Sequence, residues 1–227
     1  MGNKFYRALV DYLEIKTVSL GKYSFVLETI GDTDKLIESM NETEFKSEDR
    51  FPYWAELWPS SLGLGEHILE NRKYFRNKKV LELGCGLGLA GIAARTAEAD
   101  VLFTDYDPVA LEFARRNFKR NFGYLPDVQL MDWRFPSLRE TYDIIIGADI
   151  LYERKMLTPL LTFYSQALKD NGWILIAEPG RRIAREFLSM LDEHMWKYKT
   201  DQRTVNLNNK QQVIYIYRIN YAAPDIS

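Results

Sequence analysis

The chain has 227 residues, of which 46% are hydrophobic and 27% charged, and its formal net charge at pH 7 is −2. This composition is typical of an α/β domain with a sizeable core, and it argues against the broad positive field that nucleic-acid-binding proteins carry. One cysteine excludes an intrachain disulfide, and two isolated histidines give no metal-site spacing. No segment has the apolar length of a membrane span and the N-terminus lacks a signal-peptide core, so we expect a cytoplasmic protein.

Residues 1–50 differ in pattern from the rest and are expected to form an extension packed on a main domain of residues 51–227. Two β-favouring runs, 14–20 and 23–30, flank Gly21-Lys22 and predict a hairpin. A short helix is expected over 32–40, and the polar, charged run 41–50 is expected to be a solvated loop.

An aromatic stretch follows the extension. Four aromatic residues lie between Phe51 and Trp58, just before a helix-like segment over 60–70. These rings either fasten the extension to the core or form the wall of a ligand pocket, where an aromatic face supplies apolar contact.

From residue 79 the chain alternates strands with helices, which predicts βαβ units and a parallel sheet. The expected strands are 79–83, 101–104, 128–131, 142–147 and 173–177, and the expected helices are 87–97, 107–120, 155–169 and 183–194. Asp107 is suited to cap its helix, with Pro108 in the first position. Two further β-rich runs, 198–207 and 212–220, are joined by Asn208 and Asn209 and predict an antiparallel hairpin at one edge of the sheet.

The glycine-rich turn after the first of these strands predicts a cofactor site. Gly86-x-Gly88-x-x-Gly91 formally matches a dinucleotide fingerprint. The first glycine of that fingerprint should directly follow the strand, however, and the strand ends at Leu83. When Gly84 is taken as the first glycine, Leu89 occupies the position of the third. Glu-x-Gly-x-Gly-x-Gly instead favours S-adenosylmethionine. Asp105, at the end of the next strand, is placed to accept hydrogen bonds from the ribose hydroxyls of that cofactor.

Residues 50–182 resemble the class I, seven-β-strand methyltransferases, and more narrowly methyltransferase family 16, the protein lysine methyltransferases. Four motifs carry the resemblance: Pro52-Tyr-Trp-Ala-Glu-Leu-Trp-Pro, Leu81-Glu-Leu-Gly-Cys-Gly, Thr104-Asp-Tyr-Asp-Pro and Ala148-Asp-Ile-Leu-Tyr-Glu. The first of them and Glu178-Pro-Gly-Arg are similar to the branch that modifies the electron-transfer flavoprotein β-subunit, where the latter motif usually begins with Asp. The resemblance implies a Rossmann-like, seven-stranded, mostly parallel sheet.

The resemblance also implies a set of residues that bind S-adenosylmethionine. Gly84, Cys85 and Gly86 would line its methionine part, Asp105 would hold the ribose, and Trp58 and Ala148 would lie against the cofactor. Asp132 and Trp133 would surround the adenine, although ordinary core packing is an equally good interpretation of Trp133. Glu82 and Tyr106 complete the set. Cys85 is expected to act through its backbone and not as a nucleophile.

The implied reaction is methyl transfer to a lysine side chain of a protein. Asp149 would receive the substrate ammonium group, and Tyr152 would orient the amine and exclude water. There are two alternatives: the substrate is a small, nicotinamide-like amine, or the protein is a non-catalytic cofactor-binding module. Nucleic acid, membrane and metal partners are not expected. Arg181 and Arg182 either contact an acidic protein surface or are simply solvated. Four basic residues near the end of the predicted helix 107–120 are expected to complement the dipole of that helix: Arg115, Arg116, Lys119 and Arg120.

Overall fold

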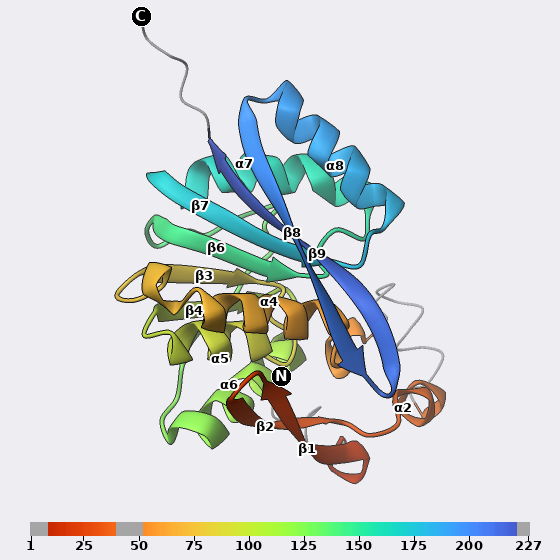
Figure 1. The fold of residues 1–227 in the computed structure, drawn as a ribbon. Coiled ribbons are helices and arrows are strands. Elements are labelled where there is room, and N and C mark those ends of the chain that lie inside the picture. Colours follow the sequence, from red (N-terminus) through yellow and green to blue (C-terminus); the bar gives the residue numbers. More distant parts are fainter. Residues whose placement is uncertain (1–8, 40–51, 222–227) are drawn as a thin grey trace, which may run out of the picture.

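The computed structural model describes residues 9–39 and 52–221, and its centre is a seven-stranded sheet (Figure 1). The strand order is β5-β4-β3-β6-β7-β9-β8. The strands are β3 (Lys79–Leu83), β4 (Asp100–Asp105), β5 (Asp127–Leu130), β6 (Tyr142–Ala148), β7 (Leu168–Glu178), β8 (Trp196–Leu207) and β9 (Lys210–Tyr221). Strands β3 to β7 pair in parallel, and β9 pairs antiparallel with both β7 and β8. The fold class expected from the sequence is confirmed.

Helices cover both faces of the sheet because the side chains of the buried strands alternate between two apolar layers. Val80 and Ile146 join one core cluster, whereas Leu81 and Ile145 join the other. The helices of the first layer are α4 (Pro59–Glu70), α5 (Leu89–Thr96) and α6 (Pro108–Phe122), and those of the second are α7 (Leu157–Ala167) and α8 (Arg182–Glu193). No helix in the described ranges combines the length and the apolar content that crossing a bilayer requires.

Local sequence signals correctly predicted one helix cap and one hairpin turn. Asp107 Oδ1 accepts a hydrogen bond from Val109 N at 2.8 Å, which caps α6 as expected. Asn208 and Asn209 both have positive φ, 52° and 60°, and form the two-residue turn of the β8–β9 hairpin.

The boundary between α7 and β7 differs from the prediction. The helix ends at Ala167, and β7 begins at Leu168 instead of Trp173. Leu168 pairs with Tyr142, and the register then shifts before Ile144 meets Trp173. Pairing with β6 therefore extends β7 over residues 168–172, which lie outside the predicted strand.

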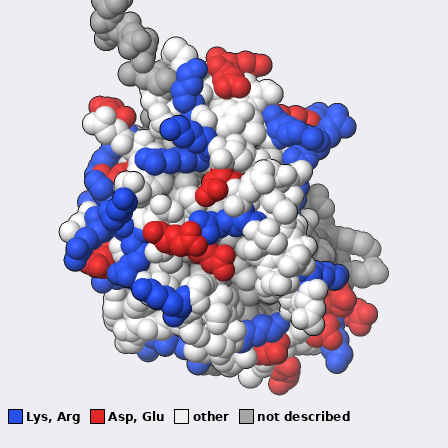
Figure 2. Space-filling view, viewed as in Figure 1, with Lys and Arg blue, Asp and Glu red and all other residues white. Residues whose placement is uncertain are grey.

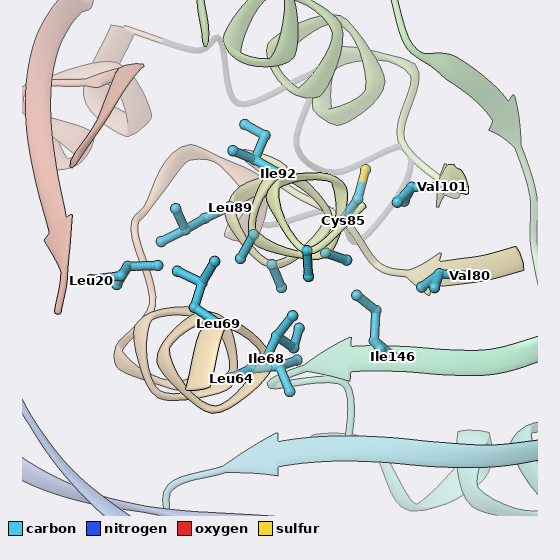
Figure 3. Close-up of a cluster of buried hydrophobic side chains, with 14 of the residues drawn as sticks. Leu20, Leu64, Ile68, Leu69, Val80, Cys85, Leu89, Ile92, Val101 and Ile146 are labelled. Carbon is cyan, nitrogen blue, oxygen red and sulfur yellow. The ribbon is translucent and has the colours of Figure 1, made fainter. Parts of the chain in front are cut away.

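Residues 13–30 form the predicted hairpin, with β1 (Leu13–Leu20) and β2 (Tyr23–Ile30) in a separate two-stranded sheet. Helix α2 (Thr33–Ser39) follows. Leu20 lies against α4 and α5 in the first core cluster (Figure 3). The predicted loop 41–50 lies outside the described residues, and the division into an extension and a main domain stays a prediction.

The basic end of α6 has a second role besides the expected one: Lys119 and Arg120 lie in the last turn of the helix, where cations complement its dipole. Arg116 and Arg120 lie 2.8 and 3.0 Å from the carboxylate of Glu28 in β2, whose side chain is only 5% exposed. These two arginines therefore neutralise a buried charge on the hairpin as well as lying near a helix end. Figure 2 shows positive and negative side chains interspersed over the face that carries the β8–β9 hairpin.

Candidate active site

A cavity of about 350 Å³ lies where the loops after β3, β4, β6 and β7 meet. This is the carboxyl edge of the parallel strands, where open α/β sheets bind ligands. Its lining residues are Tyr53, Trp54, Trp58, Gly84, Gly86, Asp105, Tyr106, Trp133, Ala148, Asp149, Ile150, Tyr152, Glu153 and Arg181. A second cavity of about 470 Å³ adjoins it and shares Tyr106, Trp133, Tyr152 and Glu153.

The glycine loop after β3 forms the floor of the cavity. Gly84 and Gly86 have φ values of +58° and +49°, a left-handed conformation that side chains other than glycine rarely adopt. A Cβ on Gly84 would lie 3.0 Å from Ile150 Cγ2. The sequence therefore needs glycine here for the turn itself, and the same absence of side chains opens the backbone to the cavity.

Asp105 ends β4 beside this loop and is only 6% exposed. Its Oδ2 accepts a hydrogen bond from Gly86 N at 3.1 Å, and its Oδ1 accepts one from Asp107 N at 3.0 Å. Burial raises the pKa of Asp105 to about 6, and the backbone donors oppose that rise. A mostly ionised acceptor at neutral pH thus faces the cavity where the ribose site was expected.

Glu82 and Cys85 are placed differently, because both side chains are absent from the described lining of either cavity. Glu82 is 4% exposed beneath the loop, and burial raises its pKa to about 8. The sulfur of Cys85 belongs to the first core cluster (Figure 3), and burial raises the pKa of its thiol. A direct side-chain contact from either residue to a ligand has no support in this arrangement.

Asp132 and Trp133 follow β5 at the second cavity. Asp132 lines it and forms an ion pair with Arg134, whose side-chain hydrogen bond lowers the pKa of the carboxyl group. Trp133 is 7% exposed, belongs to the second core cluster and lines both cavities. Its Nε1 has no hydrogen-bond partner among the described residues. Core packing and ligand contact are thus compatible roles for this one side chain.

The aromatic stretch serves both purposes that the sequence left open. Trp54 packs on Phe113 of α6, with ring centroids 5.3 Å apart, and belongs to a core cluster. Trp58 Nε1 donates a hydrogen bond to the carbonyl oxygen of Tyr53 at 2.8 Å. The Tyr53 ring lies 5.6 Å from that of Tyr152, so these two rings meet at the cavity wall.

Asp149 follows β6 in a strained backbone conformation, with φ +57°. Its N–H donates to the carbonyl oxygen of Ala177 in β7 at 2.9 Å, and its Oδ1 accepts a hydrogen bond from Arg181. Oδ2 is buried and has no hydrogen-bond partner among the described residues. Tyr152 is half-buried, and burial raises its pKa, so the phenol is neutral at pH 7.

A family model described as lysine methyltransferase matches residues 44–194. The chain belongs to this lysine methyltransferase family. Its membership confirms the resemblance found in the motifs, and it confirms S-adenosylmethionine as the cofactor.

Two named lysine methyltransferases align with about half to three quarters of the chain. The electron transfer flavoprotein beta subunit lysine methyltransferase of Xenopus laevis is 35% identical over 136 residues, 57% of this chain and 53% of that protein. The EEF1A lysine methyltransferase 3 of Mus musculus is 31% identical over 176 residues, 74% of this chain and 72% of that protein. The chain thus spans about half the length of the flavoprotein-directed relatives.

Solved methyltransferase structures share the fold at low identity. A putative RNA methyltransferase from Pyrococcus horikoshii superimposes with a TM-score of 0.58 at 17% identity, covering 76% of this chain and 88% of that one. The magnesium protoporphyrin IX methyltransferase of Synechocystis, with bound SAM, gives 0.54 at 15% identity, covering 83% and 97%. These likenesses concern the fold alone.

The residues present in this lysine methyltransferase family member fit the cofactor. Two side-chain-free positions, Gly84 and Gly86, border the cavity, and the Asp105 carboxylate stands beside them. Trp133 Nε1 is a buried donor that the described protein leaves unused, which suits a polar ligand atom.

Sequence reasoning assigned no site role to several lining residues. Tyr53 and Trp54 were in the aromatic stretch without individual roles, and Ile150 and Glu153 lie within or next to the Asp-x-x-Tyr motif. For Arg181 the sequence left two interpretations open, a contact with an acidic protein surface or a solvated side chain. Its position in the turn after β7 was the available signal, because the chain after each of the five parallel strands contributes to the cavity lining.

Proposed function

We propose that the protein transfers a methyl group from S-adenosylmethionine to a lysine side chain of a protein substrate. The observation that carries the proposal is Asp149 Oδ2, a buried carboxylate oxygen with no hydrogen-bond partner among the described residues, on a residue that lines the same cavity as Gly84 and Gly86. An unpaired buried acceptor is costly unless a ligand group satisfies it.

The substrate chemistry matches that acceptor. When bound, S-adenosylmethionine supplies a methyl group on a positively charged sulfur, which needs no further activation. A lysine ε-ammonium, with an ordinary pKa of about 10.4, arrives protonated. Asp149 Oδ2 accepts its hydrogen bond and orients the nitrogen, and the proton leaves to this carboxylate or to water before the nitrogen attacks.

The aromatic wall supports the same role. The neutral phenol of Tyr152 and the neighbouring ring of Tyr53 exclude water from the reacting nitrogen, which favours its uncharged form. Holding a nucleophile in line in this way contributes roughly 7–11 kcal/mol to rate acceleration in well-oriented systems. A cytoplasmic location is part of the proposal, and the single, buried Cys85 suits a reducing compartment.

The test uses labelled S-adenosylmethionine and a lysate of the parent organism, followed by mass spectrometry of the labelled product. We expect label on lysine of one or a few proteins. The Asp149→Ala variant should lower this labelling on the order of 10²-fold while its cofactor affinity, measured by calorimetry, stays near wild type. Label on a small molecule alone would replace the proposal with an amine methyltransferase, and cofactor binding without any product would indicate a binding module.

A further inference from the structure

Arg181 extends from the turn after β7 and donates a hydrogen bond to Asp149 Oδ1. The two side chains differ in exposure: 32% for Arg181 and 8% for Asp149. This pair therefore lies at the cavity wall with its carboxylate end inside the protein. Among the described residues that line this cavity, Arg181 is the one lysine or arginine.

Asp149 is fixed at three points. Its backbone holds a left-handed conformation, its N–H is bonded to β7, and its Oδ1 is taken by the guanidinium group. A planar guanidinium has a fixed donor geometry, so the hydrogen bond from Nη1 restrains the position of Oδ1. Oδ2 is the carboxylate oxygen that has no hydrogen-bond partner among the described residues. A substrate ammonium group that reaches this carboxylate pairs with Oδ2, because the guanidinium group already occupies Oδ1.

The turn that carries Arg181 is itself fixed by Glu178, which is fully buried. Glu178 Oε2 accepts hydrogen bonds from Gly180 N at 2.8 Å and from Arg181 N at 2.7 Å. Its Oε1 accepts one from the hydroxyl of Tyr217 in β9 at 3.0 Å. Gly180 has φ +89°, and a Cβ there would lie 2.9 Å from the Tyr215 ring. The turn is thus held from β9, with Glu in the place where the related motif has Asp.

We propose that Arg181 is a positioning residue for methyl transfer: it holds Asp149 so that Oδ2 alone receives the substrate ammonium group, and Glu178 fixes the turn from which it acts. This inference rests on the proposed function, and it adds a residue that determines orientation rather than affinity. Without the guanidinium group, the carboxylate still attracts an ammonium ion but can bind it through either oxygen and in several directions.

The experiment compares wild type, Arg181→Ala and Arg181→Lys on the purified substrate protein that the labelling identifies. Arg182→Ala is the matched control, because the neighbouring Arg182 side chain is 86% exposed. We expect kcat of Arg181→Ala to fall on the order of 10²-fold while KM for the substrate changes less than about threefold. Arg181→Lys should recover part of kcat, and Arg182→Ala should match wild type. Cofactor affinity and melting temperature should stay near wild type in all three variants.

Each result that contradicts the proposed role of Arg181 points to a different explanation. A raised KM with unchanged kcat would show that Arg181 docks the substrate, and a loss of cofactor affinity or of melting temperature would show a structural role; either overturns the inference. Equal kcat in wild type and Arg181→Ala also overturns it and leaves the proposed function standing. If wild type itself labels no protein lysine, the proposed function fails and the inference fails with it.

Discussion

Two buried carboxylates, Glu82 and Asp105, lie on either side of the glycine loop, and burial raises the pKa of both. Their surroundings give them different roles. Glu82 lies against α5, where the Gly91 N–H partly stabilises its charge, and it has no place in the described cavity lining. Asp105 lines the cavity, so its ionisation bears directly on ligand binding.

Cofactor affinity should therefore depend on pH through Asp105. The role we propose for the Asp105 carboxylate is to accept hydrogen bonds from the ribose hydroxyls. The protonated acid has less acceptor capacity, and burial raises the pKa of Asp105 to about 6. Affinity is then fully present above this pKa and is lost as pH falls through it. We expect the dissociation constant of S-adenosylmethionine to rise up to about tenfold per pH unit below pH 6.

Calorimetric titrations between pH 5 and 8 measure this effect. Asp105→Asn is the control, because its amide has no proton to gain: it should bind weakly at every pH, with little change between pH 5 and 7. A wild-type dissociation constant that stays flat over this range would contradict the assignment of Asp105 to the ribose.

At the scale of elements, α6 joins the N-terminal hairpin to the glycine loop. Asn117 is fully buried, and its Oδ1 accepts a hydrogen bond from Glu28 N of β2 at 2.6 Å. Its Nδ2 donates to the carbonyl oxygens of Glu28 and of Leu87, at 3.1 and 3.0 Å. Leu87 lies between Gly86 and Gly88, so one amide ties the hairpin to the cofactor loop.

Asn117→Ala should lower both stability and cofactor affinity. It leaves buried backbone groups of Glu28 and Leu87 without a partner, which costs about 1–3 kcal/mol of unfolding free energy for each unsatisfied group. The cofactor affinity should fall because the loop loses one of its supports. Chemical denaturation and calorimetry measure the two effects.

Asn121→Ala provides the matched control. Asn121 Oδ1 accepts a hydrogen bond from the backbone N–H of Val26, in the same hairpin, at 3.0 Å. Its Nδ2 donates to the carbonyl oxygen of Val26 at 2.9 Å and to that of Asn117 in its own helix. Its loss should lower stability without changing cofactor affinity. Equal affinities in the two variants would show that the hairpin does not support the loop.

The elements themselves were predictable where short-range signals decide them. Asp107-Pro108 set the start of α6, and the Asn208-Asn209 pair set the last hairpin. The start of β7 was predicted wrongly because distant pairing with Tyr142 determines it. The attachment of the hairpin could not be predicted either, since Asn117 and Glu28 are 89 residues apart and an asparagine in a helix carries no signal of its partner.

At the scale of the whole molecule, one geometric rule explains why much of the site implied by the family resemblance comes together. Because parallel strands end at one edge, Asp105 at the end of β4 lines one cavity together with Trp133 and Asp149, which follow β5 and β6. The rule does not say which way a side chain points. Glu82 and Cys85 face the interior, whereas Arg181 reaches the cavity from a turn whose shape depends on Glu178.

The core gives no sign of a boundary between hairpin and sheet. The first core cluster contains Leu20 and Leu27 of the hairpin together with Leu175 of β7 and Ile214 of β9. Hydrophobic contact within this cluster runs from the hairpin to β9, and the buried Glu28 adds ion pairs to α6. A shared core of this kind favours cooperative unfolding of the elements that contribute to it.

We therefore expect a single thermal transition for the whole chain, seen at the same temperature by tryptophan fluorescence and by far-ultraviolet circular dichroism. S-adenosylmethionine binds only the folded state, so at 100 times its dissociation constant it should stabilise the protein by about 2.7 kcal/mol. For a chain of this size that raises the melting temperature by roughly 5–10 °C. At the same concentration of S-adenosylmethionine, Asp149→Ala should show the same shift, because our proposal places Asp149 at the substrate, whereas Asp105→Asn should show a smaller one. An early transition that S-adenosylmethionine leaves unchanged would mean that the hairpin unfolds separately from the sheet.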